Sequence, residues 1–373
     1  MTRVVVIGAG LAGLTLAQGL RKAGVDVRIY EKDAGMEARF QGYRIGLLDY
    51  GWSALRACLP EESYELAVAT SGDLTGPGLL FDDQLRLLAS GDEIGPPEDA
   101  RVVDRHVFRH VLAGGLQDRI EYGKKLASFS ETTAGVRAVF TDGTEVSGDV
   151  LVGADGGFSA VRRLLLPHVG FQTADLGGAM GRTQLTDQFR RLVHGRGTMV
   201  KGPGITLMLG RMEFRTPPGK LGLPPTDSYV RWVMLIPPDH PAGQPSDQPP
   251  PAIAVVRDLL RDWHPDIVDL IARADAHNSV IGFAQVLDQP VTGWDAERVT
   301  MLGDAAHLTL ASGGNGANTA LRDAETLCAR LVGDGDLRAY QKEMLERGNA
   351  AVEFSKQNQK KFVPSSVSSS GSS

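Results

Sequence analysis

The first thirty residues contain the feature that most constrains the fold. An apolar run from Arg3 to Ile7 predicts a buried parallel strand, and Gly8-Ala9-Gly10-Leu11-Ala12-Gly13 follows it and opens a helix. In such a unit the first glycine makes the turn, the second lets the backbone approach a pyrophosphate, and the third lets the helix pack on the strand. The pattern therefore predicts a parallel α/β fold that binds a dinucleotide.

A carboxylate stands where this unit needs one. The next predicted strand, Asp26 to Tyr30, ends at Glu31. A carboxylate there can accept hydrogen bonds from the hydroxyls of an adenosine ribose, and it would repel a 2′-phosphate. The alternative is a solvated charge at a strand end. Both FAD and NAD fit this first unit.

A second strand-loop-helix unit lies near the other end of the chain. Val299 to Leu302 is strand-like, Gly303-Asp304 is a charged break, and Gly313-Gly314-Asn315-Gly316 leads into a helical pattern from Ala317. The first N–H groups of that helix have no partner within it, so they favour an anion. Asp304 can accept hydrogen bonds from hydroxyls. The unit suits a flavin and its ribityl chain, or else it is an ordinary connection with Asp304 capping a turn.

Length and composition narrow the class of protein. A chain of 373 residues exceeds what one hydrophobic core usually serves, so we expect two domains or a large α/β domain with insertions. A net charge of −6 gives no indication of the basic surface that nucleic-acid binding requires. No apolar run is long enough for an integral membrane segment. Cys58 and Cys328 are the only cysteines, which excludes a cysteine-rich metal site. The short N-terminal apolar run is no signal peptide, which predicts a cytoplasmic location.

Four cations are candidates for contact with the cofactor. Arg39 and Arg44 lie in a glycine-broken stretch, where arginine is either solvated or paired with phosphate. Arg105 lies in the first turn of a helix predicted from Val102 to Leu116, where a cation opposes the helix dipole and indicates a specific partner such as phosphate. Lys32, directly after Glu31, is the fourth.

A third acidic turn follows a predicted β-meander in residues 121–153. The apolar strand from Val150 to Gly153 leads into Ala154-Asp155-Gly156-Gly157-Phe158-Ser159, which is again a strand, an acidic turn and a helix start. Asp155 either caps the helix of residues 158–166 or faces a cofactor.

Residues 71–99 and 166–284 differ in character. Short apolar pieces at 79–81 and 85–88 predict a hairpin, and strand-like segments at 205–209, 212–214 and 229–236 predict an antiparallel sheet. The proline-rich residues 237–251 predict a surface loop, and residues 252–263 an amphipathic helix. Side chains on the strands either form plain core or line a pocket for a flat apolar substrate; the pocket candidates are Met208, Phe214, Trp232 and Met234.

Together these motifs resemble the class A FAD-dependent monooxygenases, the aromatic hydroxylase family that includes p-hydroxybenzoate hydroxylase and the tetracycline-degrading monooxygenases. The matching residues are Gly8, Gly10, Gly13 and Glu31 for the dinucleotide fingerprint, Gly153 to Arg162 for the DG motif, Gly303-Asp304 for the GD motif, and Arg105 for an arginine that contacts FAD. The resemblance implies a Rossmann-like FAD-binding domain of the glutathione reductase type with an inserted antiparallel substrate domain. The implied boundaries are 1–70, 100–165 and 285–333 for the former, 71–99 and 166–284 for the latter, a C-terminal helix at 334–363, and a disordered tail at 364–373.

The resemblance also implies a set of cofactor contacts. Asp155 is expected near the pyrophosphate and the NAD(P)H groove, Asp304 at a ribityl oxygen, and the backbone of residues 314–318 at flavin N1 and O2. We expect no catalytic side chain and no metal, because the flavin performs the chemistry, and we expect His307 to pack in its turn. The full set is Gly8, Gly10, Leu11, Ala12, Gly13, Glu31, Lys32, Arg39, Arg44, Arg105, Asp155, Gly303, Asp304, Gly314, Gly316, Ala317 and Asn318.

The implied reaction is a monooxygenation by a monomer or homodimer. NADPH or NADH, as a transient co-substrate, would reduce FAD, and O2 would form a C4a-hydroperoxide that hydroxylates or epoxidises an apolar aromatic or polyketide-like small molecule. Leu310-Ala311-Ser312 stands where many relatives have a proline beside C4a, which keeps open a double-bond reductase of the geranylgeranyl reductase type. A flavin-dependent halogenase and a non-catalytic binding protein on the same fold are further alternatives.

Overall fold

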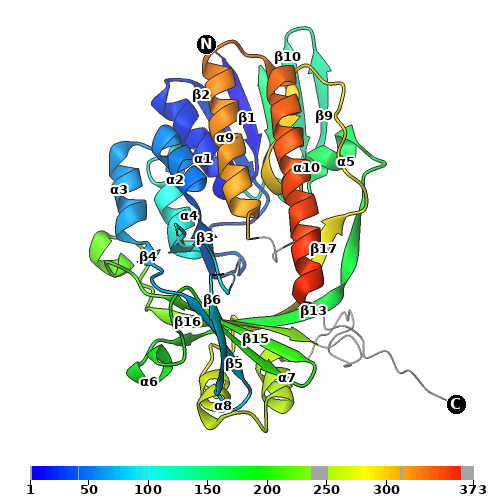
Figure 1. Cartoon of the computed structure of the whole chain (residues 1–373). Coiled ribbons are helices and arrows are strands. Elements are labelled where there is room, and N and C mark those ends of the chain that lie inside the picture. The colour runs from blue at the N-terminus through cyan, green and yellow to red at the C-terminus, as the bar shows by residue number, and fades with distance from the viewer. Residues whose placement is uncertain are drawn as a thin grey trace, which may run out of the picture.

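The computed structural model describes residues 2–40, 42–92, 94–97, 99–236, 251–310 and 314–362. They form two β-sheet units stacked one above the other, with the long helices on the upper unit (Figure 1). Two predicted segments, the proline-rich loop up to residue 250 and the tail at 364–373, lie outside the described residues.

A five-stranded parallel sheet forms the centre of the upper unit. Its strand order is β18-β12-β1-β2-β8, and every neighbouring pair is parallel. The two central strands are apolar along their whole buried length, as expected for a sheet covered on both faces. The strands are β1 (Arg3–Ile7), β2 (Asp26–Glu31), β8 (Ile120–Tyr122), β12 (Val150–Gly153) and β18 (Val299–Met301). The predicted α/β fold with a Rossmann-like parallel sheet is confirmed.

Helices and a small meander cover this sheet. Helix α1 (Leu11–Lys22) packs against α9 (Gly316–Val332), α2 (Asp49–Cys58) and α4 (Arg105–Ala113), while α10 (Leu337–Phe362) packs against α9 (Figure 1). The predicted meander is present, and its strands are β9 (Leu126–Thr132), β10 (Gly135–Phe140) and β11 (Glu145–Gly148). The remaining helices of this unit are α3 (Glu61–Ala69) and α5 (Ala160–Leu165).

The helix predicted to begin at Val102 begins three residues later. Residues 101–104 form strand β7 (Arg101–Asp104), which pairs with β3 (Arg44–Leu47) and β4 (Gly72–Asp73) in a three-stranded sheet between the two units. The Asp104 carboxylate caps α4 by accepting a hydrogen bond from the Val107 N–H at 2.9 Å. The cap marks a helix start that the apolar pattern, continuous from strand into helix, did not reveal.

A seven-stranded sheet forms the lower unit, in the order β17-β13-β16-β15-β14-β5-β6. The predicted hairpin is its edge, and the two predicted strands at 205–214 are one strand, β15. The strands are β5 (Gly78–Asp82), β6 (Leu87–Gly91), β13 (Phe171–Gln184), β14 (Thr198–Gly202), β15 (Ile205–Met212), β16 (Tyr229–Ile236) and β17 (Val280–Leu287). Below this sheet lie α6 (Asp187–Arg190), α7 (Ala252–Leu259) and α8 (Pro265–Ala272), so its upper face is turned to the parallel-sheet unit (Figure 1).

The two units meet through an aromatic junction. Tyr43, next to β3, lies 5.9 Å from the ring of Tyr229 on β16, and the Tyr229 hydroxyl donates to Asp104 at 2.8 Å. The guanidinium of Arg182 lies over both tyrosine rings. These contacts fix the upper face of the seven-stranded sheet against the strand that leads into α4.

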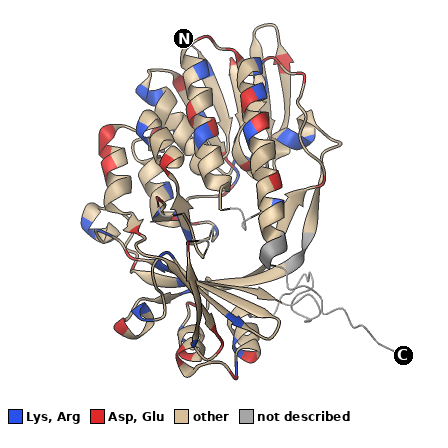
Figure 2. Ribbon diagram, viewed as in Figure 1, with Lys and Arg blue, Asp and Glu red and all other residues tan. Residues whose placement is uncertain are grey.

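The charged residues are dispersed. Figure 2 shows Lys and Arg interspersed with Asp and Glu along α9 and α10, which agrees with the small net charge of −6. Among the helices that the structure describes, none combines the length and the apolar character needed to cross a bilayer.

Candidate active site

The glycine-rich turn after β1 has the geometry that its sequence predicts. Gly8 has φ +110°, and a Cβ there would lie 2.4 Å from the Ala154 carbonyl oxygen. A Cβ on Gly13 would lie 2.3 Å from the Gly8 oxygen, so helix and strand are in close contact at that point. A Cβ on Gly10 would meet only the Ala154 oxygen, at 3.9 Å. The turn is thus closed at Gly8 and Gly13 and open above Gly10, where α1 begins.

Glu31 and Arg109 hold this turn from two sides. The buried Glu31 carboxylate accepts hydrogen bonds from the Ala9 N–H at 2.7 Å and from the Asp33 N–H at 3.0 Å. Arg109 on α4, also buried, donates to the Ala9 oxygen at 3.2 Å and to the Met36 oxygen at 3.3 Å. Its Nε has no partner among the described residues. Arg109 was not among the predicted site residues, although an arginine among the apolar residues of an amphipathic helix was a usable signal.

Asp304 and Arg105 are half-buried polar groups: no described residue donates a hydrogen bond to the Asp304 carboxylate, and the buried Arg105 Nε has no acceptor there. Asp304 lies in the turn after β18, and a Cβ on Gly316 would lie 3.8 Å from its Oδ1. Burial raises the pKa of Asp304, although the positive charges of His307, Arg105 and Arg162 counteract that shift. Burial also lowers the pKa of Arg105, whose Nε has no partner within the described chain. Polar groups in such a setting cost free energy when they have no hydrogen-bond partner, so a ligand that binds at this turn would remove that cost.

The start of α9 lies beside Asp304 and carries no side-chain cap. Its free N–H groups are therefore directed at this space, as the sequence predicts. The Asn318 side chain is engaged elsewhere, since it accepts from the Leu48 N–H at 2.8 Å and donates to the Gly46 oxygen at 3.0 Å. It thereby ties β3 to the start of α9. Residues 311–313 of the glycine loop, and with them most of the Leu310-Ala311-Ser312 segment, lie outside the described residues.

Asp155 acts as a helix cap in this structure. Its carboxylate accepts hydrogen bonds from the Ser159 hydroxyl at 2.5 Å and from the Ala160 N–H at 2.6 Å, at the start of α5. Of the two roles expected for Asp155, the cap is the one observed, and a cofactor contact stays a prediction. The neighbouring Arg162 donates to the oxygens of Gly157 and, at 2.8 Å, of Ala305. Arg162 therefore joins the turn after β12 to the turn after β18.

A buried ionic network lies behind the turn of Asp304. The Asp323 carboxylate on α9 accepts from the Gly303 N–H at 3.0 Å, from His307 Nε2 at 2.5 Å and from Arg347 Nη2 at 2.7 Å. Burial alone would lower the pKa of His307, but the charge and hydrogen bond of Asp323 outweigh burial and raise it. His307 packs in its turn, as expected. Asp323 was not among the predicted site residues.

The other predicted cofactor contacts differ in exposure and in which of their atoms a ligand could reach. Lys32 is exposed, and Arg39, which is 55% exposed, pairs with Asp33 at 2.8 Å. Leu11, Ala12 and Ala317 lie in the first turns of α1 and α9, where only their backbone can serve a ligand. Gly314 has φ +65°, which suits the loop before α9.

Arg44 points toward the seven-stranded sheet. Its guanidinium lies 2.8 Å from where a Cβ of Gly210 would be, and it donates to the Arg211 oxygen at 2.6 Å. Gly210 on β15 is paired with Arg231 on β16, and cross-strand partners share a face, so Arg44 and Arg231 meet on the upper face. Burial and the charge of Arg231 lower the pKa of Arg44 to about 9, which leaves it charged at neutral pH. Neither guanidinium forms an ion pair within the described chain.

An apolar row runs beside these arginines on the same face. The strand registers place Met180 opposite Val233, Val233 opposite Met208, and Met208 opposite Met199. Met208 was a predicted pocket residue and remains a candidate. Its partly exposed neighbours on this row were not predicted.

Two of the predicted pocket residues are wrong. Trp232 and Met234 are fully buried and pack with residues of α7 and α8 on the lower face of the sheet. Adjacent residues of a strand point to opposite faces, so Val233 points up where Trp232 and Met234 point down. Phe214 packs in the aromatic junction with Tyr43 and Tyr229.

Comparison with known proteins places the chain in a family. The family model described as an FAD binding domain matches residues 102–355, and a model of an NAD(P)-binding Rossmann-like domain matches residues 6–65. A putative FAD-containing monooxygenase from Photorhabdus luminescens is 26% identical, with a TM-score of 0.82 over 97% of this chain and 99% of that one.

Curated relatives agree with this assignment. The FAD-dependent monooxygenase thnD of Trichoderma harzianum is 28% identical over 95% of this chain and 92% of its own length. A dual O-methyltransferase/FAD-dependent monooxygenase of Cercospora nicotianae is 31% identical over 89% of this chain, but the match spans only 42% of that longer protein. The chain belongs to the FAD-binding-domain family, as its three motifs indicated, and it is similar to FAD-dependent monooxygenases over nearly its whole length.

Proposed function

We propose that this chain is an FAD-dependent monooxygenase that uses NADH or NADPH and O2 to hydroxylate or epoxidise a small molecule. The proposed substrate has a flat apolar part and one acidic group. One observation carries the proposal. Asp304, half-buried and without a hydrogen bond to its carboxylate among the described residues, lies beside the uncapped start of α9, and its charge acts on Arg105, whose buried Nε has no partner there. Both residues belong to the unit that faces the upper side of the seven-stranded sheet. A cofactor bound there would have its reactive ring between the two units.

The residues present fit FAD. The open space above Gly10 at the start of α1 would take the pyrophosphate, and Glu31 would accept from the adenosine ribose. Asp304 would accept from the ribityl chain, and the first N–H groups of α9 would face the polar edge of the ring. Arg105 would lie against a phosphate or ring oxygen. The carboxyl ends of β1, β12 and β18 lie at one edge of the sheet, which is where such folds bind dinucleotides.

The protein supplies position, charge and exclusion of water. Reduced FAD supplies the activated oxygen, which is chemistry that belongs to the cofactor. The uncapped N-terminus of α9 would stabilise negative charge on a ring bound there, because the helix dipole and the free N–H groups favour an anion at that end. The apolar row of Met180, Val233 and Met208 would cover the reacting face and keep water out.

Arg44 and Arg231, which lie beside this apolar row, indicate the class of substrate. Arg44 and Arg231 repel each other in a buried setting, and burial lowers the pKa of both. A carboxylate or phenolate between them would supply the missing opposite charge and form charge-assisted hydrogen bonds. The flat apolar part of the same molecule would then lie over the methionine and valine side chains. We therefore infer an acidic aromatic or polyketide-like substrate.

The reaction itself can be tested with isotopic oxygen. NADH and NADPH oxidation and peroxide release are measured against a panel of polycyclic phenols and aromatic acids, and products are examined by mass spectrometry under 18O2. A monooxygenase gives a product with one labelled oxygen and consumes one equivalent of nicotinamide per product. Addition of two hydrogens without oxygen would instead establish the double-bond reductase.

The substrate class has a separate test that needs no turnover. Binding of 2-naphthoate and 2-naphthamide to the FAD-loaded protein is followed by the change in flavin absorption. The acid should bind more tightly, and Arg231→Gln should weaken the acid to the level of the amide. Arg211→Gln is the matched control, because its side chain points to the lower face and pairs with Glu213 at 3.4 Å. Equal binding of acid and amide to the unmodified protein would refute the acidic class while leaving the monooxygenase untouched.

The predicted domain boundaries, the cytoplasmic location, and the monomeric or homodimeric state remain predictions.

A further inference from the structure

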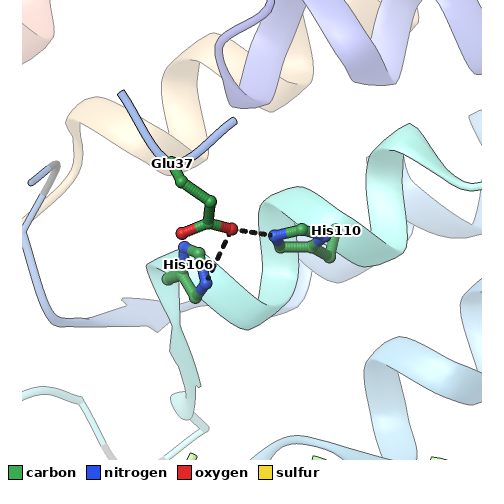
Figure 3. A group of neighbouring side chains, drawn as sticks. All are labelled: Glu37, His106 and His110. Atoms are coloured by element: carbon green, nitrogen blue, oxygen red, sulfur yellow. Dashed lines mark hydrogen bonds and ion pairs between the residues drawn. The ribbon is translucent and has the colours of Figure 1, made fainter. Parts of the chain in front are cut away.

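A cluster of three potential metal ligands lies on the outer side of α4. His106 and His110 are four residues apart on that helix, so their side chains share one face, and Glu37 approaches them from the segment between β2 and β3 (Figure 3). Glu37 Oε1 lies 2.9 Å from His110 Nε2 and 3.4 Å from His106 Nε2. The three ligand atoms all lie within 4.8 Å of one another.

These separations suit a tetrahedral metal ion. Bonds of about 2.0 to 2.2 Å at tetrahedral angles put neighbouring ligand atoms roughly 3.3 to 3.6 Å apart. The Glu37–His106 distance of 3.4 Å already has this value, and the Glu37–His110 distance of 2.9 Å needs a small side-chain rotation. Both histidines present the same nitrogen, Nε2, to one carboxylate oxygen, so a single ion between them would contact all three.

The charges around the cluster also favour a cation. Glu37 pairs with no lysine or arginine among the described residues, and its only partners there are the two histidines. The side chains of Glu37, His106 and His110 are 68%, 36% and 25% exposed. The remaining coordination position is thus open to water.

We propose that Glu37, His106 and His110 form a binding site for a divalent transition-metal ion of the zinc, nickel or copper class. Two imidazoles and one carboxylate are ligands that these ions prefer, whereas calcium and magnesium prefer oxygen ligands alone. Such a site is separate from the proposed oxygenation, because none of its three ligands is among the residues assigned to FAD or substrate.

A bound ion would also clamp the segment that follows Glu31. Residues 32–40 run from the end of β2, where Glu31 holds the glycine-rich turn, past Met36, whose oxygen accepts from Arg109. Joining Glu37 to α4 would therefore fasten this segment to the helix that carries Arg105 and Arg109. The segment directly follows Glu31, which would bind the ribose of FAD, so FAD release would require this segment to move. The ion should slow that release.

Metal binding is tested with the full-length, FAD-loaded protein lacking a polyhistidine tag. Isothermal titration with ZnCl2 should give one saturable site, and His106→Gln, His110→Gln and Glu37→Gln should each weaken it by at least about tenfold. His277→Gln is the matched control, since His277 is an exposed histidine on a turn and is not a member of this cluster. Absence of a saturable site, or a site that survives the double variant His106→Gln/His110→Gln, would overturn the proposal.

Spectroscopy and cofactor release provide independent measurements. The Cu2+ complex should show electron paramagnetic resonance hyperfine structure from two imidazole nitrogens, and that signal should be lost in His110→Gln. The rate of FAD release on dilution, followed by flavin fluorescence, should fall when Zn2+ is present and return when a chelator is added. The double variant should show one rate under all conditions. Equal release rates with and without Zn2+ in the unmodified protein would overturn the clamp.

Discussion

The first prediction concerns the buried ionic network around Asp323, which should stabilise the turn of Gly303 and Asp304. We consider Asp323→Asn, which removes the charge but keeps the size of the side chain. One carboxylate oxygen of Asp323 serves Gly303 and His307, and the other serves Arg347. An amide offers one acceptor and one donor. In either orientation its NH2 group therefore meets a donor, and His307 and Arg347 lose their counter-charge.

The expected loss is large because the carboxylate is fully buried. Removing one partner of a buried, hydrogen-bonded ion pair costs about 3 to 5 kcal/mol. Arg347 is 27% exposed and keeps some contact with water, so we expect a value near the lower end of this range. The free energy of unfolding should therefore fall by about 3 kcal/mol, measured by urea titration of FAD-free protein so that cofactor affinity does not enter.

The pH dependence gives a second check with a definite sign. Because Asp323 raises the pKa of His307, the stabilisation from their pair is complete below the ordinary histidine pKa and is lost as the pH rises through the raised value. The difference between wild type and Asp323→Asn should therefore narrow as the pH rises above neutrality. Asp334→Asn, at an exposed pair with Arg330, is the control and should have little effect. A loss below about 1 kcal/mol for Asp323→Asn would show that the network does not carry the turn.

Three further predictions concern the cofactor. Gly10→Ala should fold normally, because its Cβ would meet no atom closer than 3.9 Å, but it should lose FAD, because the methyl group occupies the space for the pyrophosphate. The flavin content of the purified variant is measured by absorbance. Gly282→Ala is the control, because no atom lies within 4 Å of a Cβ at that position. Glu31→Lys should release FAD during gel filtration, because a cation replaces the ribose acceptor; a variant that keeps full flavin would contradict the assignment. Asp304→Ala should weaken FAD binding by about 1 to 3 kcal/mol, or about 5- to 150-fold in a fluorescence titration, and an unchanged affinity would remove Asp304 from the site.

The sequence revealed the parts of the site that depend on local geometry. The roles of Gly8, Gly10 and Gly13 follow from one turn, and the structure shows each glycine in the setting that its role requires. Strand, turn and helix in that order also located Asp304 beside the start of α9. These features are visible in sequence because every residue involved is close to the others along the chain.

The errors and omissions came from long-range geometry. Trp232 and Met234 were expected in a pocket, but only the register of β16 against its neighbours tells which face of the sheet a residue occupies. The pairing of Arg44 with Arg231 joins residues almost two hundred positions apart. Asp323 was missed because its partners come from another turn and from α10. None of these relations leaves a periodic trace in the sequence.

The strand order of the parallel sheet determines how long β12 remains without one of its partner strands while the chain is synthesised. β12 pairs with β1 on one side and with β18 on the other, and β18 begins at Val299. At a synthesis rate of about 5 to 20 residues per second, one edge of β12 stays without its partner for roughly 8 to 30 seconds after it leaves the ribosome. The seven-stranded sheet is largely translated during this interval. The nascent chain therefore exposes an apolar strand edge for far longer than a small domain takes to fold, and it should depend on chaperones at that stage.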